Sequence, residues 1–345
     1  MIPIQNIYYM LSYAFQVLNE QGYKNIATEQ FNNTGELMAA ILEKGIAIQL
    51  KRGLGKEYIL QTEALSSLRG KIDIAESIKT QSMLRKQLIC TYDEFSVNSI
   101  MNRIIKSTVE LLLRSNISKQ RKKNLRKLMV YFSEVDFIDL YTVNWNVQYN
   151  RNNQTYRMLI SICYLVVKGL LQTQSNGHTE LMDFLDEQRM CRLYEKFILE
   201  YYRKEFKNQF TANASQIPWQ LDNEENSMLP VMQSDIMLQS GEKVLIIDAK
   251  YYEHSTQVQF DKHTLHSGNL YQIFTYVKNK EYELREKDHT VSGMLLYAKT
   301  DEAIYPNNVY QMSGNQITVR TLDLNLSFDE IAGQLNTIAK THFDL

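Results

Sequence analysis

Two aspartates and a lysine in the C-terminal half of the sequence are the strongest candidates for catalytic residues: Asp235, Asp248 and Lys250. Ser240-Gly241 separates two apolar runs and predicts a β-hairpin, because glycine tolerates the positive φ of a tight turn. With these two residues as the loop, Asp235 faces Ile246 and is the diagonal neighbour of Asp248, about 7–8 Å away. The strand period of two directs Lys250 to the same face.

These three side chains suit the hydrolysis of a phosphodiester. Two carboxylates offer hard oxygen ligands to Mg²⁺, which keeps several waters and shares itself with substrate phosphates. An ammonium beside them can orient or help deprotonate an attacking water and offset charge that develops on the phosphate. The alternative is a surface hairpin that ends in an ordinary Asp–Lys ion pair, because Asp-x-Lys after an apolar strand is a short pattern. Spacing alone leaves both interpretations open.

Two predicted helices could add residues to this site. Gln272 and Tyr276 are four apart on a helix predicted over 268–279, so they share a face that could look toward DNA. A Gln that caps a core helix is the alternative. Glu195 lies among apolar residues on a helix predicted over 188–206, where an acid can reach a metal. A Glu that faces solvent is the alternative there.

The elements that must position these residues fall into two parts. Five helices are predicted first, at 6–18, 36–50, 98–114, 118–132 and 156–171. Short alternating stretches at 58–61, 71–74 and 87–92 predict a strand-rich insertion over about 57–97. After a linker candidate at 172–179, helices are predicted at 188–206, 268–279 and 328–342, with strands within 229–247 and at 293–298, 309–312 and 316–320.

This order predicts an α+β N-terminal domain, helical with a small strand-rich insertion, over residues 1–180. An α/β domain follows over residues 181–345.

Composition places the chain among globular proteins. Hydrophobic residues make up 44% and charged residues 22% of the 345 residues, and the formal net charge is -1. That balance gives no global positive field, so any contact with DNA must be local. The basic run at 119–127 could touch a phosphate backbone or an acidic partner surface; a solvated helix face is the more common explanation.

Nothing in the sequence indicates export, a membrane or zinc. The N-terminus does not resemble a secretory signal, and the most apolar long run, 159–171, is too short to cross a bilayer. Cys90, Cys163 and Cys191 lack the paired spacing of zinc ligands or of a redox motif. We therefore expect a cytoplasmic protein without membrane association.

The succession of Glu195, Asp235, Asp248-Ala249-Lys250 and Gln272-x-x-x-Tyr276 resembles the PD-(D/E)XK nuclease superfamily in its restriction-endonuclease-like form. One departure is Ser234, which stands where that motif has proline before the first acid. The whole chain resembles the McrC family, the nuclease subunits of McrBC modification-dependent restriction systems. The stretches that carry this resemblance are IPIQNIYYML at 2–11, LRGKI at 68–72, NRIIKST at 102–108, HS at 266–267 and NLYQ at 269–272.

The resemblance implies a restriction-endonuclease-like α/β domain with a central mixed sheet and a role for each site residue. Asp235 and Asp248 are expected to hold Mg²⁺, with the Ala249 carbonyl as a further ligand. Lys250 is expected to position the attacking water. The residues expected to assist catalysis are Glu195 and Gln272, and those expected near DNA are Tyr276 and His266.

It also implies a division of labour with a partner, a hexameric AAA+ GTPase like McrB that recognises modified cytosine, such as 5-methylcytosine, in double-stranded DNA. The N-terminal region would stimulate the partner's GTP hydrolysis, with Arg69 and Lys71 as expected partner contacts. GTP is expected in the partner alone, because residues 52–57 lack the spacer and the Ser or Thr of a Walker A loop. The competing hypothesis is a non-catalytic activator of an AAA+ ring that retains a nuclease-like fold, although such a chain would be expected to have lost one of the three site residues.

Overall fold

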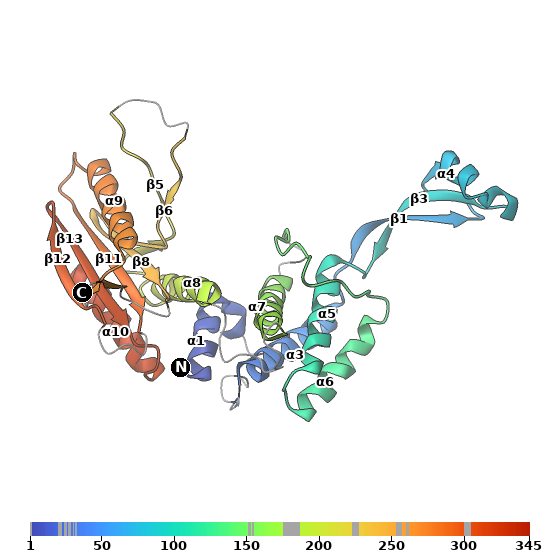
Figure 1. Cartoon of the computed structure of the whole chain (residues 1–345), viewed down its shortest axis with the longest axis horizontal. Coiled ribbons are helices and arrows are strands. Elements are labelled where there is room, and N and C mark those ends of the chain that lie inside the picture. Colours follow the sequence, from blue (N-terminus) through green and yellow to red (C-terminus); the bar gives the residue numbers. More distant parts are fainter. Residues whose placement is uncertain are drawn as a thin grey trace. The chain divides into compact units, whose positions relative to one another are not determined.

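The computed structural model of the chain divides into two compact units, which are described separately (Figure 1). Unit 1 is Met1–Gln30 with Phe184–Leu345, and unit 2 is Phe31–Asp183. The structure describes every residue except 1, 20–22, 24, 25, 27, 28, 30, 32, 151, 152, 154, 175–186, 223–227, 253–256, 260, 261 and 300–304. Residues 172–174 of the predicted linker belong to a helix, and the rest of it, with the predicted boundary at 180, lies outside the described residues.

Unit 2 is a group of helices that carries a strand-rich subdomain. Its helices are α3 (Thr34–Arg52), α5 (Ile100–Arg114), α6 (Lys119–Met129), η4 (Val130–Phe132) and α7 (Tyr156–Gln174). Asn33, Ser99 and Ser118 cap α3, α5 and α6, each accepting a hydrogen bond from a backbone N–H three residues on. Helix α3 packs on α6 and α7, and α5 packs on α7.

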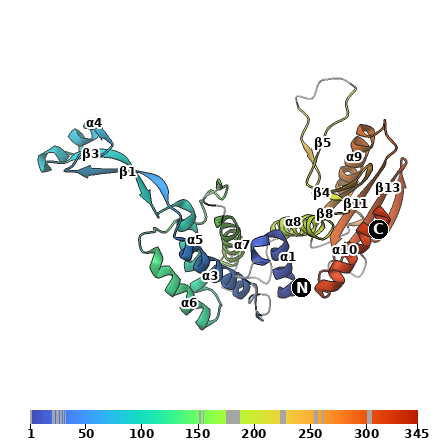
Figure 2. The same ribbon diagram turned by 180° about the vertical axis from the view of Figure 1, so that it is seen from behind.

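The strand-rich subdomain, residues 57–96, corresponds to the insertion predicted at about 57–97. It comprises β1 (Glu57–Leu65), β2 (Lys71–Asp73), α4 (Ile74–Lys79), η3 (Ser82–Arg85) and β3 (Leu88–Ser96). Its antiparallel sheet has the order β1-β3-β2. Figures 1 and 2 both show β1 and β3 extending away from the helices of their own unit.

Unit 1 is built on a mixed six-stranded sheet of order β12-β13-β11-β8-β7-β4. The strands are β4 (Thr211–Asn213), β7 (Ile236–Ser240), β8 (Lys243–Lys250), β11 (Thr290–Ala298), β12 (Asn308–Met312) and β13 (Asn315–Leu322). Strand β11 is parallel to β8 and β13, and the other pairs are antiparallel. Two short pairs join β5 (Gln216–Ile217) to β6 (Met232–Gln233) and β9 (Gln257–Gln259) to β10 (Lys262–Thr264). The predicted mixed sheet is confirmed.

Helix α9 (Ser267–Glu283) covers one face of this sheet. Its Ile273 and Val277 are fully buried against Val244 and Ile246 of β8. The contact is close because β11 has Gly293 there, where an added Cβ would lie 2.8 Å from both Ile273 and Val277. This helix and β8 carry the residues described below.

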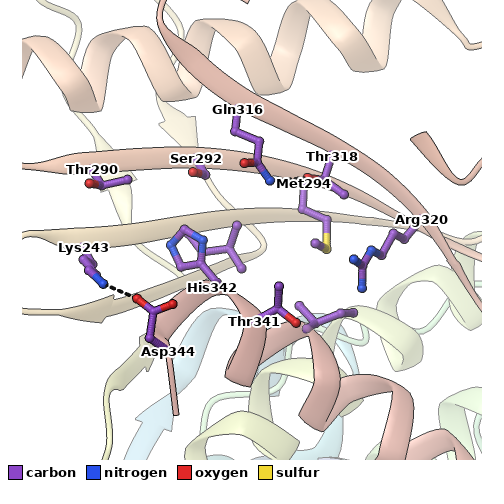
Figure 3. Close-up of a pocket in the computed structure, with 12 residues that line it drawn as sticks. Lys243, Thr290, Ser292, Met294, Gln316, Thr318, Arg320, Thr341, His342 and Asp344 are labelled. Carbon is purple, nitrogen blue, oxygen red and sulfur yellow. Dashed lines mark hydrogen bonds and ion pairs between the residues drawn. The ribbon is translucent and has the colours of Figure 1, made fainter. Parts of the chain in front are cut away.

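Helices α8 (Glu187–Glu205) and α10 (Phe328–Phe343) form a second layer in unit 1. The Tyr202 hydroxyl donates to the Leu335 carbonyl at 3.0 Å, which ties the two helices together. A pocket of about 300 Å³ lies between α10 and the sheet face that carries Lys243 and Met294, with Arg320 and His342 in its lining (Figure 3). Successive residues of a strand point to opposite faces of a sheet, so this is the face opposite to the one that α9 covers. The pocket is therefore not part of the site built around Asp248, which lies on the α9 face.

The first 30 residues correct the predicted domain division, because they belong to unit 1 and not to the N-terminal unit. Helix α1 (Ile4–Ala14) packs on α8. The Asn6 amide donates to the carbonyls of Leu324 and Leu326, both at 2.8 Å, and Tyr9 stacks on Phe328. The helical periodicity of this segment predicts an apolar face but does not say which unit that face packs against. Within the described part of the chain, no helix is long and apolar enough to span a membrane.

Candidate active site

The β7–β8 hairpin brings Asp235 and Asp248 together, one loop residue later than predicted. Ser240 pairs with Lys243, so the loop is Gly241-Glu242, and Gly241 takes the positive φ of 59°. Ile236 pairs with Ile247, and the same register continued by one residue sets Asp235 directly opposite Asp248 instead of diagonal to it. The two carboxylates still share a face, because the register differs from the predicted one by two residues and not by one.

Each aspartate has a distinct anchor. The Asp235 carboxylate accepts a hydrogen bond from the Ala249 N–H at 3.0 Å, which ties it to the neighbouring strand. Asp248 is only 1% exposed and pairs with Lys250, whose Nζ lies 3.0 Å from Oδ1 and 2.9 Å from Oδ2. The Lys250 side chain is 13% exposed. The ion pair therefore exists but is buried, unlike the surface pair of the alternative interpretation.

Burial dominates the electrostatics of this pair. It raises the pKa of Asp248 to about 7, and Asp235 adds to the rise while Lys250 opposes it. Burial also disfavours the Lys250 ammonium, but the negative charges of Asp248 and Asp235 outweigh this and hold its pKa above its ordinary value. Lys250 therefore stays protonated at neutral pH.

Gln272 and Tyr276 of α9 extend the site. Gln272 Oε1 accepts from Lys250 Nζ at 3.4 Å, and its Nε2 donates to the Tyr276 hydroxyl at 2.9 Å. The two residues share a helix face, as their spacing predicts. Tyr276 is 8% exposed and belongs to the core beneath α9, so the structure favours an orienting role on Gln272 over a surface presented to DNA.

Glu195 of α8 lies at the edge of the site. The Cys191 thiol donates to its carboxylate at 3.0 Å. Burial raises the pKa of Glu195, the charge of Asp235 raises it further, and the charge of Lys250 lowers it. The Glu195 carboxylate therefore interacts electrostatically with both of these site residues. Burial, followed by Glu195, raises the pKa of Cys191 to about 12, so the thiol stays protonated as a donor.

His266 immediately precedes α9 and is partly buried. Its side chain makes no cap hydrogen bond to the helix, and its ring lies 5.3 Å from that of Tyr252. The structure thus places it six residues, or nearly two helical turns, before Gln272. Its expected role near DNA stays a prediction.

A chain of hydrogen bonds behind Lys250 was not anticipated from sequence. Tyr297 of β11 pairs in register with Lys250. Its hydroxyl accepts from the buried Asn269 amide at 2.9 Å, and Tyr252 donates to Asn269 Oδ1 at 3.3 Å. Burial raises the pKa of Tyr297 to about 12. Only the resemblance pointed to Asn269, within NLYQ; nothing in the spacing pointed to Tyr297, because its position depends on the parallel pairing of β11 with β8.

The donor set fits a magnesium ion. Asp248 Oδ2 is buried, and the charge that it meets is the Lys250 ammonium, 2.9 Å away. No three His, Cys, Asp or Glu side chains among the described residues are grouped closely enough to enclose a metal. Two carboxylates without a full protein cage suit Mg²⁺, which takes its remaining ligands from water and substrate phosphates. Ala249 lies between Asp248 and Lys250, and its carbonyl as a ligand stays a prediction.

The two expected partner contacts lie in the strand-rich subdomain of unit 2. Arg69 pairs with Glu94 at 2.8 Å and stacks over the Tyr92 ring at 4.0 Å. Lys71 is exposed at the start of β2. Gly70 between them has φ +68, and a Cβ there would lie 2.4 Å from the Thr91 carbonyl oxygen, so only glycine fits at this position.

A family model and one relative of this chain agree on one family. A family model described as "McrBC 5-methylcytosine restriction system component" matches residues 5–298. The Type IV methyl-directed restriction enzyme EcoKMcrBC of Escherichia coli (strain K12) is 30% identical over 329 residues, which cover 94% of this chain and 93% of the relative. Two solved assemblies of Thermococcus gammatolerans are also similar. A half-complex of McrB AAA+ hexamers with bound McrC has 19% identity and a TM-score of 0.49, with coverage of 97% of this chain and 76% of that chain. The McrBC complex has 23% identity and a TM-score of 0.43, with coverage of 59% of this chain and 59% of that chain.

Proposed function

Because the chain belongs to the family of McrBC 5-methylcytosine restriction system components, we propose that it is the Mg²⁺-dependent endonuclease subunit of such a system. The observation that carries this proposal is the buried Asp248–Lys250 pair on the same sheet face as Asp235. Burying such a pair costs desolvation free energy that hydrophobic residues would not cost, and sites of this kind are typical of function. The domain would thereby be of the PD-(D/E)XK type.

The residues divide the chemistry of phosphodiester hydrolysis among them. Asp235 and Asp248 would hold Mg²⁺, which when bound supplies Lewis-acid charge to the scissile phosphate. Lys250 remains protonated, so it orients the attacking water and offsets phosphate charge without accepting a proton. Gln272 fixes the direction of the Lys250 ammonium, and Glu195 assists from α8.

The same proposal assigns the partner. An AAA+ GTPase hexamer of the McrB type would bind GTP and read modified cytosine in double-stranded DNA in the cytoplasm. The strand-rich subdomain would contact it and stimulate its GTPase. Support comes from large apolar side chains that this subdomain leaves exposed, including Tyr58 at 74%, Leu60 at 68% and Leu84 at 81%. Arg69 and Lys71 lie in the same subdomain.

The test is cleavage of methylated duplex DNA by the chain with its GTPase partner, GTP and Mg²⁺. We expect Asp248→Asn to reduce cutting by roughly 100-fold or more, because the buried metal-binding charge is lost. Asp344→Asn is the matched control, because Asp344 pairs with Lys243 at the other end of β8 but is exposed. Equal cutting by Asp248→Asn and wild type would refute the site.

The GTPase rate separates this proposal from the adaptor hypothesis. Asp248→Asn should stimulate the partner as well as wild type does, because the substitution lies in unit 1, far along the chain from residues 57–96. A wild-type chain that stimulates GTP hydrolysis but never cuts in Mg²⁺ would favour the non-catalytic activator.

A further inference from the structure

Helix α6 of unit 2 presents a cationic face. Its sequence, KQRKKNLRKLM, has no Asp or Glu. At about 100° per residue, five cations fall within an arc of about 140°: Lys119, Lys122, Lys123, Arg126 and Lys127. Four of the five are exposed and Lys122 is half-buried. We call these five residues the α6 cationic face.

The opposite side of α6 packs on the rest of unit 2, and its polar side chains pair with Glu36 and Glu43. Leu125 is fully buried. Arg121 pairs with Glu43 at 2.9 Å and with Glu36 at 3.4 Å, and the Asn124 amide donates to Glu43 at 2.9 Å. None of the five side chains of the α6 cationic face makes an ion pair or hydrogen bond with another described residue. The helix is therefore held rigidly while these five charges stay uncompensated.

Charge is also divided unequally between the two units. Unit 2 has 21 Lys and Arg against 14 Asp and Glu, a formal charge of +7, and unit 1 has 17 against 25, a charge of -8. The net charge of -1 for the chain hides this separation. The unit that holds the candidate nuclease site repels a polyanion at long range, so attraction must come from unit 2.

We propose that the α6 cationic face binds the phosphate backbone of duplex DNA. The proposal rests on the proposed function, which makes DNA the substrate. The five charges span about 12 Å of helix axis, and a duplex carries one phosphate charge per about 1.7 Å, so several phosphates come within reach of one face. Tyr131 of η4 follows Lys127 by four residues and is exposed, so its hydroxyl can donate to a further phosphate. Such contacts hold DNA without reading its sequence.

The experiment measures how salt affects binding of the full-length chain to a fluorescent unmodified duplex in EDTA, which prevents cutting. Each phosphate contact contributes about -0.9 to the slope of log K against log salt. We expect Arg126→Gln/Lys127→Gln to make the slope shallower by about 1.8 and to weaken binding at low salt at least tenfold. The matched control is Lys51→Gln/Arg52→Gln, which also removes two exposed cations from the last turn of a unit 2 helix. It should leave the slope unchanged.

Three outcomes would overturn the inference. They are no measurable binding by wild type, equal slopes for the α6 variant and wild type, and equal loss in the α6 and control variants, which would mean that only total charge matters. A variant that loses GTPase stimulation but keeps the salt slope would show that the face binds an acidic partner instead. Failure of the nuclease proposal is distinguishable, because the salt slope is measured in EDTA and does not depend on whether the chain cuts.

Discussion

Replacing Gly293 with alanine should impair the candidate site more than it destabilises the fold. A Cβ at this position would lie 2.8 Å from Ile273 and Val277 of α9 and 2.9 Å from Ile317 of β13. Ordinary contacts begin near 3.4 Å, so α9 must move from the sheet by roughly half an ångström or more. Gln272 precedes Ile273 on this helix and already contacts Lys250 at 3.4 Å, so that contact should be lost.

The expected magnitudes follow from overpacking. Forcing one methyl group into a packed core costs about 1–3 kcal/mol. For a unit of this size that lowers Tm by roughly 2–12 °C. Displacing a positioning residue by a fraction of an ångström can cost up to about 100-fold in rate, so cutting below Tm should fall by roughly 10-fold or more.

Two controls isolate the close contact. Gly268→Ala lies in the first turn of α9, where an added Cβ meets no atom within 4 Å, and should leave Tm and cutting near wild type. Val277→Ala removes the methyl group that the new Cβ would strike. The double variant Gly293→Ala/Val277→Ala should therefore be more stable than the sum of the two single effects predicts, by at least about 0.5 kcal/mol.

The assays are thermal unfolding and cleavage with the partner at a temperature where all variants are folded. An unchanged Tm for Gly293→Ala would show that α9 does not approach β11 so closely. A lowered Tm with full cutting activity would show that the height of α9 above the sheet does not set the geometry at Lys250.

Three further predictions concern other parts of the chain. The double variant Asp248→Leu/Lys250→Met should unfold in EDTA with a free energy about 1–4 kcal/mol higher than that of wild type while cutting nothing. A lower stability in chemical denaturation would contradict the view that burying this pair is costly. Gly70→Ala should abolish GTPase stimulation, because φ +68 and the Thr91 carbonyl leave no room for a Cβ. The unfolding temperature of unit 1 should not change, because Gly70 lies in unit 2, and full stimulation by the variant would refute the prediction. Partial burial lowers the pKa of His342, so the unfolded chain takes up a proton there first, and stability falls as pH drops through about 6.5. His342→Gln should weaken that fall in denaturation curves at pH about 7.5 and 5.5, and an identical pH dependence would argue against a half-buried neutral ring.

Local patterns predicted the helices well. The helix predicted over 188–206 is Glu187–Glu205, and the one predicted over 328–342 is Phe328–Phe343, where Ser327 and Glu330 form a capping box. Strand alternation predicted that Asp248 and Lys250 share a face, and the ion pair confirms it. These features depend on neighbours within a few residues, which a sequence displays directly.

Long-range pairing was harder to predict. Glycine fits more than one loop position, so the pattern identified the hairpin but placed its loop one residue early. The predicted strand pair also begins too early, at residue 229, whereas β7 starts at Ile236. Tyr297 pairs in register with Lys250 only because β11 lies between β8 and β13, an order set by tertiary packing. The unequal formal charges of the two units, +7 and -8, likewise could be found only from the unit boundaries, because the composition of the whole chain gives a net charge of -1.

The anchoring of α1 within unit 1 affects when that unit can fold during translation. Asn6 and Tyr9 are made before unit 2, but the residues they contact, at 324–328, are made after all of it. Since chains are made at about 5–20 residues per second, α1 waits for roughly 15 seconds or more before its docking surface exists. Helix α1 therefore cannot dock on the rest of unit 1 until the chain has been made as far as Phe328, whatever part of unit 2 has already folded.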